Sequence, residues 1–248
     1  MSSLADLVQR LVNRESSRTE ADVAADVRSF FLTAPFQLDE GDVENVLLES
    51  QLGDRRRIDV EVGSTVVEVK RDLRKGRVRQ EAVEQLAGYV ETRGNQTGRR
   101  YIGVLTDGAE WRCYNLVDGA LHEVSEITVS ADRADVERLV VWLEGVLATA
   151  KGIPPTASEI KARLGAGSSA HQLDRATLVA LYAANRDLPT VKLKRALWSR
   201  LLTSALGTQF QDNDELFVEH TLLVNSAEII AHAVLGFSVK SLNHVSLV

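Results

Sequence analysis

The sequence feature that most constrains the fold is a run of alternating apolar and charged residues between Arg57 and Lys70. The alternation has the period of two that is typical of a half-buried β-strand. Gly63-Ser64 in its middle suits a two-residue hairpin turn of type II′, because glycine supplies the positive φ of the first central position. The sequence therefore predicts a β-hairpin with one apolar side and one charged side.

The turn also fixes the register, which places three pairs on the apolar side: Val62 with Thr65, Val60 with Val67, and Ile58 with Val69. On the charged side Asp59 lies opposite Glu68, with Lys70 two residues further along. Residues that face each other lie about 5 Å apart, where two carboxylates repel unless one is protonated or a cation lies between them.

Mg²⁺ is usually held by one or two carboxylates together with water and phosphate oxygens. We therefore expect a metal site at Asp59 and Glu68. Lys70 would position the attacking water or stabilise charge that develops on a phosphate. A surface hairpin that carries charges without a function is the alternative at this point.

The first 150 residues are expected to form an α/β domain with a mixed sheet, because strand, helix and strand follow one another. Thr19 to Asp22 has the pattern of a capping box, which predicts a helix that begins there. The other expected helices are Leu4–Val12, Glu81–Thr92 and Asp132–Ala150, and the other expected strands are Asn45–Glu49, Tyr101–Leu105 and Trp111–Leu116.

After Lys151-Gly152-Ile153-Pro154-Pro155 the pattern changes to helical periodicity alone. We predict two domains, one over residues 1–150 and an all-α domain over residues 151–248.

Composition narrows the class of protein. The chain has 248 residues, 26% of them charged, with one cysteine and five histidines. A single cysteine excludes an internal disulfide framework, and the absence of a long apolar run or a secretory signal leads us to expect a cytoplasmic protein without membrane contact.

The net charge of −6 argues weakly against non-specific coating of DNA, yet cations gather around the hairpin and after it. As a DNA-binding surface we consider Arg57, Arg71, Arg74, Lys75, Arg77 and Arg79. An ordinary solvated loop explains these cations equally well.

Asp59 followed by Glu68-Val69-Lys70 resembles the active-site motif of the PD-(D/E)XK nuclease superfamily, although Ile58 stands where that family often has proline. The resemblance implies a restriction-endonuclease-like sheet flanked by helices. It also implies Mg²⁺, with Mn²⁺ able to substitute, bound by Asp59, Glu68, the Val69 carbonyl and Glu20. Glu49 is a weaker candidate for the part of Glu20, which could also simply favour the helix N-terminus.

Gln85 and Tyr89 resemble the Gln-x-x-x-Tyr motif of the RecB-like branch of this superfamily. Four residues apart on a helix, they share a face. The resemblance implies that both flank the active site and contact DNA, while the alternative for Tyr89 is an ordinary core position.

Gly103 to Tyr114 resembles the segment after the catalytic helix in restriction enzymes. The helical part resembles the connector that precedes the methyltransferase in single-chain restriction–modification enzymes of types IIG, IIL and ISP. The residues that carry this likeness are Leu197-Trp198, Asp214–Leu223 and Ala227–Leu235.

The methyltransferase motifs themselves are absent from the sequence, so S-adenosylmethionine would belong only to a missing domain. The expected function is that of a metal-dependent endonuclease, the cleavage module of a phage-defence enzyme. Its partners would be double-stranded DNA, methyltransferase and target-recognition domains of the same or another chain, and a transient second copy for double-strand cleavage. The alternatives are a nuclease-fold DNA-binding or docking module that is inactive alone, and a RecB-like repair nuclease that acts on DNA ends.

Overall fold

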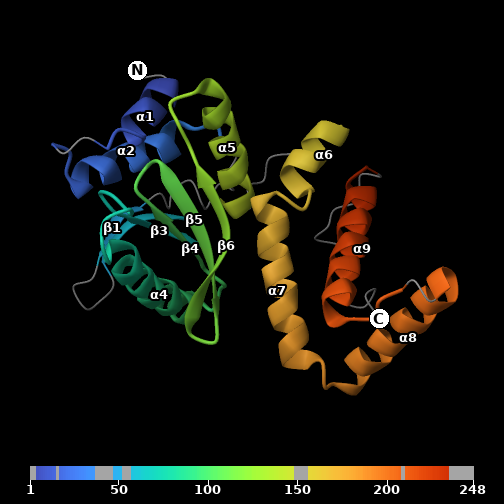
Figure 1. Ribbon diagram of the computed structural model, residues 1–248. Helices are drawn as coiled ribbons and strands as arrows, with labels where there is room; N and C mark the ends of the chain where they lie inside the picture. The colour runs from blue at the N-terminus through green and yellow to red at the C-terminus, as the bar shows by residue number, and fades with distance from the viewer. Residues whose placement is uncertain are drawn as a thin grey trace. The chain divides into compact units, whose positions relative to one another are not determined.

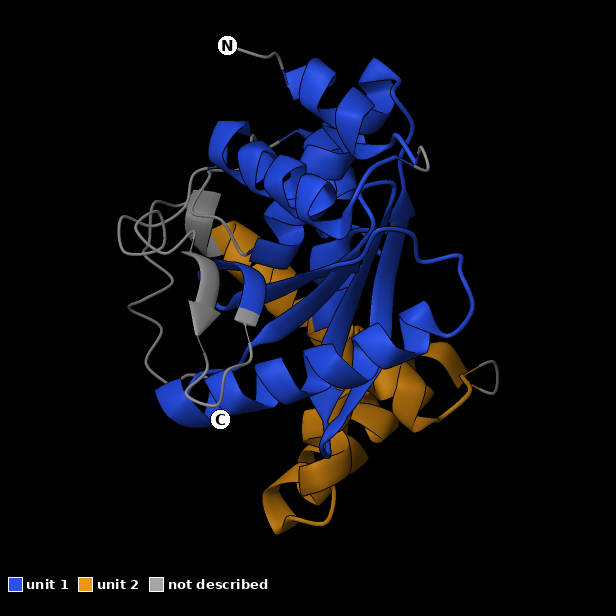
Figure 2. Cartoon of the chain, turned by 90° about the vertical axis from the view of Figure 1, so that its left-hand side faces the viewer, with its two compact units in different colours: residues 1–173 blue, residues 174–248 orange. Residues whose placement is uncertain are grey.

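The computed structural model describes residues 4–14, 17–36, 47–51, 57–147, 156–207 and 210–234. The chain divides into two compact units, Met1–Leu173 and Asp174–Val248, which Figure 2 distinguishes by colour. Each unit is described below by itself.

Unit 1 is built on a six-stranded mixed sheet whose strands lie in the order of the sequence (Figure 1). The strands are β1 (Leu47–Gln51), β2 (Arg57–Val62), β3 (Thr65–Val69), β4 (Ile102–Thr106), β5 (Glu110–Val117) and β6 (Ala120–Thr128). Neighbours are antiparallel except β3 and β4, which run parallel and are joined by the helix α4 (Val78–Thr97). The expected mixed α/β sheet is thereby confirmed.

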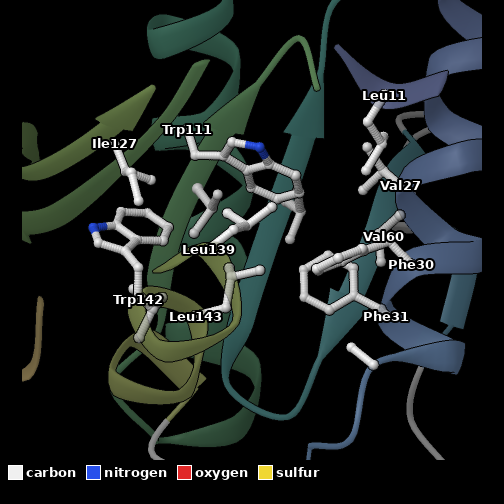
Figure 3. Packing of buried hydrophobic residues seen from close by; sticks show 14 of the residues in the cluster. Leu11, Val27, Phe30, Phe31, Val60, Trp111, Ile127, Leu139, Trp142 and Leu143 are labelled. Atoms are coloured by element: carbon white, nitrogen blue, oxygen red, sulfur yellow. The ribbon is translucent and has the colours of Figure 1, made fainter. Parts of the chain in front are cut away.

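Helices cover both faces of this sheet. On one face lie α1 (Leu4–Leu11), α2 (Glu20–Thr33) and α5 (Arg133–Leu147), and Figure 3 shows Phe30 and Phe31 of α2 packed toward Trp111 of β5. On the other face α4 packs through a second apolar cluster that contains Leu86 and Tyr89. Two buried faces explain why β3 and β4 are buried along their whole length.

The close packing of α4 depends on Gly103 of β4. A Cβ atom at this position would lie 3.0 Å from the side chain of Leu86 and 3.3 Å from that of Val90. The side chains of Leu86 and Val90 therefore pack directly on the backbone of β4, and another residue at this position would force them to shift.

The predicted hairpin is confirmed in its turn and in most of its register. Gly63 has a φ of 55°, and Ser64 is not among the residues with positive φ, as a type II′ turn requires. Val62 pairs with Thr65 and Val60 with Val67, both as expected.

The prediction that Ile58 lies opposite Val69 on the same apolar side is wrong. The described β2–β3 ladder ends at Val60, and Ile58 packs in the cluster beneath α4, whereas Val69 packs in the cluster beneath α2. The physical reason is a contact of Asp59, described with the site below.

Other local predictions fare similarly. The capping box at Thr19 and Asp22 is present, with both reciprocal hydrogen bonds. The helix expected at Glu81–Thr92 is longer at both ends. The strand expected at Asn45–Glu49 overlaps β1, which runs to Gln51, and its first two residues lie outside the described part of the chain. Strand β6 was not predicted, although it follows β5 through a two-residue turn.

The border between the two units falls later in the chain than the border expected at residue 150. The helix α6 (Ala157–Leu164) belongs to unit 1, where Arg163 pairs with the buried Glu144 of α5. The hydroxyl of Ser169, at the start of α7 (Ser169–Asn185), donates to the Trp142 carbonyl at 2.6 Å. Polar contacts of this kind leave no trace in a hydrophobic periodicity.

Unit 2 is helical, as predicted for the C-terminal region. It comprises the rest of α7 together with α8 (Pro189–Leu206) and α9 (Asp214–Val234). Trp198 packs edge-on against Phe217, and its indole Nε1 donates to His220 Nδ1 at 3.0 Å. Of the helices in the described ranges, none combines the length and apolar character that crossing a bilayer requires.

One glycine gives a test of the packing in unit 1. Gly108, in the β4–β5 turn, has a φ of 88°, and a Cβ there would lie 2.3 Å from the Leu11 carbonyl oxygen. Gly119 has a similar φ of 78° but open space around it. We expect Gly119→Ala to cost about 1 kcal/mol, from backbone strain alone, and Gly108→Ala to cost about 1–3 kcal/mol more.

Urea unfolding of both variants measures this difference, with Gly119→Ala as the matched control. Equal losses of stability in the two variants would contradict the close approach of α1 to this turn.

Candidate active site

Asp59 lies where the ladder between β2 and β3 ends. Its carboxylate oxygen Oδ2 accepts a hydrogen bond from the Val69 N–H at 2.8 Å. In a continued antiparallel ladder that N–H would bond to the Ile58 carbonyl. Because the side chain replaces the backbone partner, β2 leaves the register at this point, and the Asp59 carboxylate is fixed beside the strand that carries Glu68.

Glu68 is the most unusual group of the site. Its side chain is 1% exposed, and Oε1 accepts a hydrogen bond from Lys70 Nζ at 2.6 Å. The other oxygen, Oε2, is buried and has no hydrogen-bond partner among the described residues. Burial, reinforced by the charge of Asp59 and opposed by Lys70, raises the pKa of Glu68 to about 7. A buried carboxylate oxygen without a partner costs folding free energy, so it calls for an explanation.

Lys70 lies between two carboxylates. Its Nζ is 2.6 Å from Glu68 Oε1 and 3.4 Å from Glu20 Oε1. Burial favours the neutral amine, but the hydrogen bond to Glu68 and the surrounding carboxylates outweigh it and raise the pKa of Lys70. The side chain therefore stays a cation at neutral pH and does not accept a proton.

Glu20 is the first residue of α2, and the capping box fixes the start of that helix. The side chain is half exposed, in contrast to the buried Glu68. The structure thus brings Glu20, Asp59, Glu68 and Lys70 together from one helix and one hairpin.

Gln85 and Tyr89 of α4 share a face, as predicted. Gln85 Nε2 donates to the Tyr89 hydroxyl at 2.7 Å. Burial raises the pKa of Tyr89, and the charges of Glu68 and Asp59 raise it further, which places the hydroxyl within their electrostatic field. Contact of this pair with DNA remains a prediction.

The cations expected to face DNA lie mostly between β3 and α4. Arg74 Nε is 3.0 Å and Lys75 Nζ 3.7 Å from the Asp72 carboxylate, so two of them pair within their own segment. Arg79 lies 3.4 Å from Glu123 of β6.

The remaining three differ from one another. Arg77, directly before α4, is exposed, and Arg71 is half-buried. Arg57 begins β2, but its side chain lies outside the described part of the chain, as does that of Glu49.

Asp107 is a site-supporting residue that sequence reasoning missed. Its buried carboxylate accepts hydrogen bonds from the Leu73 N–H at 3.1 Å and from Arg14 Nη2 at 2.9 Å. The Lys70 N–H bonds to the Thr106 carbonyl at 2.9 Å. Together these contacts anchor the segment that begins at Lys70 to the β4–β5 turn. The aspartate of the Thr-Asp-Gly turn was the available signal.

The donor set fits a hard divalent cation. Within the described residues no three His, Cys, Asp or Glu side chains are grouped as a metal cage. Asp59 and Glu68 nevertheless lie together, and Glu68 Oε2 lacks a partner. Because Mg²⁺ needs only one or two carboxylates and keeps several waters, this arrangement suits Mg²⁺ or Mn²⁺. The parts of Glu20 and of the Val69 carbonyl as ligands remain predictions.

Comparison with protein-family models, with curated proteins and with solved structures finds no match to this chain. The geometry of the site therefore has to carry the functional argument.

The raised pKa of Glu68 has a measurable consequence for stability. In the folded protein the Glu68 carboxyl group has a pKa of about 7, whereas the ordinary pKa of glutamate is 4.5. The stabilising contribution is therefore fully present below the ordinary pKa and is lost as pH rises through the folded one. Glutamine cannot ionise, so Glu68→Gln does not lose this contribution. As pH rises, the free energy of unfolding of Glu68→Gln should therefore increase by about 3 kcal/mol relative to that of the wild type.

Urea unfolding of the two proteins at about pH 5 and about pH 8, without divalent metal, measures this change. Glu137→Gln on the exposed side of α5 controls for the substitution itself. The same difference between Glu68→Gln and wild type at both pH values would contradict the raised pKa.

Proposed function

We propose that this chain is a metal-dependent DNA endonuclease with a restriction-endonuclease-like fold. The observation that carries the proposal is the buried Glu68 carboxylate, which has one unsatisfied oxygen and lies beside Asp59 and Lys70. A divalent cation would satisfy that oxygen and offset the repulsion between the two carboxylates.

Two carboxylates also argue against a surface that only holds nucleic acid. DNA is polyanionic, so Asp59 and Glu68 repel it unless a cation is bound between the protein and a phosphate. A module that serves only to bind DNA gains nothing from such a pair, whereas metal-dependent phosphodiester hydrolysis can use it to hold the cation.

The residues of the site divide the work as follows. Asp59 and Glu68 would hold the cation, which supplies activation of water and neutralisation of phosphate charge. Lys70 stays protonated, so it orients the attacking water and offsets charge on the phosphate. Glu20, 3.4 Å from Nζ, gives the lysine a second carboxylate partner.

Tyr89 and Gln85 lie on α4, and the charges of Glu68 and Asp59 act on the tyrosine hydroxyl. Their hydrogen bond fixes the direction of the tyrosine hydroxyl. In the proposed function they contact the DNA backbone next to the scissile phosphate.

We further propose that the chain is the cleavage module of a restriction–modification enzyme and that unit 2 is its connector. Trp198 lies in one of the stretches that resemble such connectors, and it contacts Phe217 and His220, which lie in another. Methylation and sequence recognition would then be supplied by domains of the same or a partner chain.

The nuclease proposal predicts metal-dependent nicking of supercoiled plasmid. With Mg²⁺ or Mn²⁺ the wild type should convert supercoiled plasmid into nicked circles. Lys70→Ala should lower the rate of this nicking by at least about a hundredfold. Lys192→Ala, which removes an exposed lysine of unit 2, is the matched control and should cut like the wild type.

Three results of this experiment would count against the proposal. No cleavage with either metal would favour a binding or docking module that is inactive alone. Equal cleavage by Lys70→Ala would place the activity elsewhere. Degradation of linear DNA with closed circles left intact would favour a repair nuclease that acts on ends.

Metal binding gives a separate prediction. Asn at position 59 can still accept the Val69 N–H, so Asp59→Asn removes the charge and keeps the hydrogen bond that ends the hairpin. We expect its affinity for Mn²⁺, measured by titration calorimetry, to fall by more than about tenfold. Asp187→Asn in unit 2 controls for the loss of one negative charge. Unchanged affinity in Asp59→Asn would exclude Asp59 as a ligand.

A further inference from the structure

The segment between β3 and α4 pairs two of its cations with a carboxylate of its own. The Asp72 carboxylate accepts hydrogen bonds from Arg74 Nε at 3.0 Å, from Arg74 Nη2 at 3.1 Å and from the Arg74 N–H at 3.1 Å. Lys75 Nζ lies 3.7 Å from the same carboxylate. The Asp72 carboxylate thus forms ion pairs with two of the cations that follow Lys70.

The two sides of this contact differ in exposure. The Asp72 side chain is 7% exposed, whereas those of Arg74 and Lys75 are 56% and 61% exposed. The hydrogen bonds from Arg74 hold the pKa of Asp72 at about 2, so the carboxylate is ionised throughout the neutral range. The anion is fixed in the surface, and the cations lie over it, open to solvent.

Contacts of the backbone fix where this pair stands. The Leu73 N–H bonds to Asp107, and the Lys70 N–H bonds to the Thr106 carbonyl. Asp72 is therefore held only two residues from Lys70. These two hydrogen bonds, on either side of Asp72, hold its backbone close to the active site.

Ion pairs between exposed groups contribute typically about 0–1 kcal/mol. Here only the two cations are exposed, but the buried Asp72 carboxylate keeps the hydrogen bond from the Arg74 N–H when the side chains leave it. Such a pair can be exchanged when a phosphate approaches. An Arg or Lys released to a DNA phosphate also releases a counterion from the DNA, which makes binding more favourable at low salt.

We infer that Asp72 limits the affinity of this segment for DNA, because it holds Arg74 and Lys75 until phosphates replace it. The inference rests on the proposed function. In the DNA-free protein the two cations are paired with Asp72, and they exchange it for backbone phosphates when DNA reaches the site. The cleavage unit then binds DNA weakly by itself, in keeping with the net charge of −6. Stable engagement depends on DNA that another domain delivers.

The test is a double-mutant cycle read by the fluorescence anisotropy of a labelled DNA duplex, with EDTA present so that no cleavage occurs. Asp72→Asn keeps an acceptor for the Arg74 N–H and removes the charge. We expect its affinity to rise about three- to tenfold, with a salt dependence steeper by about one to two counterions. In a background of Arg74→Ala and Lys75→Ala the same substitution should change affinity by less than about twofold.

Two controls separate pairing from general charge. Asp72→Glu keeps the negative charge and should bind like the wild type. Asp187→Asn also removes one negative charge, from an ion pair with Lys192 at 3.0 Å in unit 2, and should leave affinity within about twofold. An equal gain from Asp72→Asn in both backgrounds, or no gain at all, would overturn the inference, because the effect would then not come from released cations.

The plasmid experiment keeps this inference distinct from the proposed function. Metal-dependent nicking without an Asp72→Asn effect on binding would leave the nuclease standing and remove the role of Asp72. A gain in DNA binding by Asp72→Asn without any nicking would support the role of Asp72 and count against the nuclease. If Asp72→Asn binds DNA no better than the wild type and the wild type does not nick the plasmid, both proposals fall.

Discussion

The hydrogen bond from the Val69 N–H to the Asp59 carboxylate is the contact on which the candidate site depends. It ends the β2–β3 ladder where an ordinary hairpin would continue, and it fixes one carboxylate beside another. On its other edge β3 pairs with β4 in parallel, so the strand that carries Glu68 and leads to Lys70 is held from both sides. A rigid strand between two ladders suits groups that must keep their geometry during a reaction.

The sequence predicts well what neighbouring residues decide. The II′ turn, the capping box and the shared face of Gln85 and Tyr89 follow from the chemistry of a few consecutive positions, and all three are present. The turn register also predicts the grouping of Asp59, Glu68 and Lys70, although the observed ladder ends at Val60. Ile58 breaks that register because a side chain replaces a backbone acceptor, and alternation of apolar residues carries no information about such a substitution.

The structural features that the sequence analysis did not predict were missed for two different reasons. Strand β6 had a readable signal, since Asp118 and Gly119 both have positive φ in a two-residue turn of the kind that Asp-Gly favours. Its alternation is weak, because most of its residues are at least partly exposed. The pairing of Asp72 and the attachment of α6 to unit 1 had no such signal. They depend on which charged groups the fold brings together.

Gly103 shows how a residue without functional groups can restrict the rest of the sequence. A larger side chain there would press on the side chains of Leu86 and Val90, which would have to give way for α4 to keep its place, and α4 also carries Tyr89. Variation at Gly103 would thus be tolerated only together with smaller residues on the facing side of α4. The geometry of the candidate site therefore also depends on a glycine and its helical neighbours, which would have to change as a group.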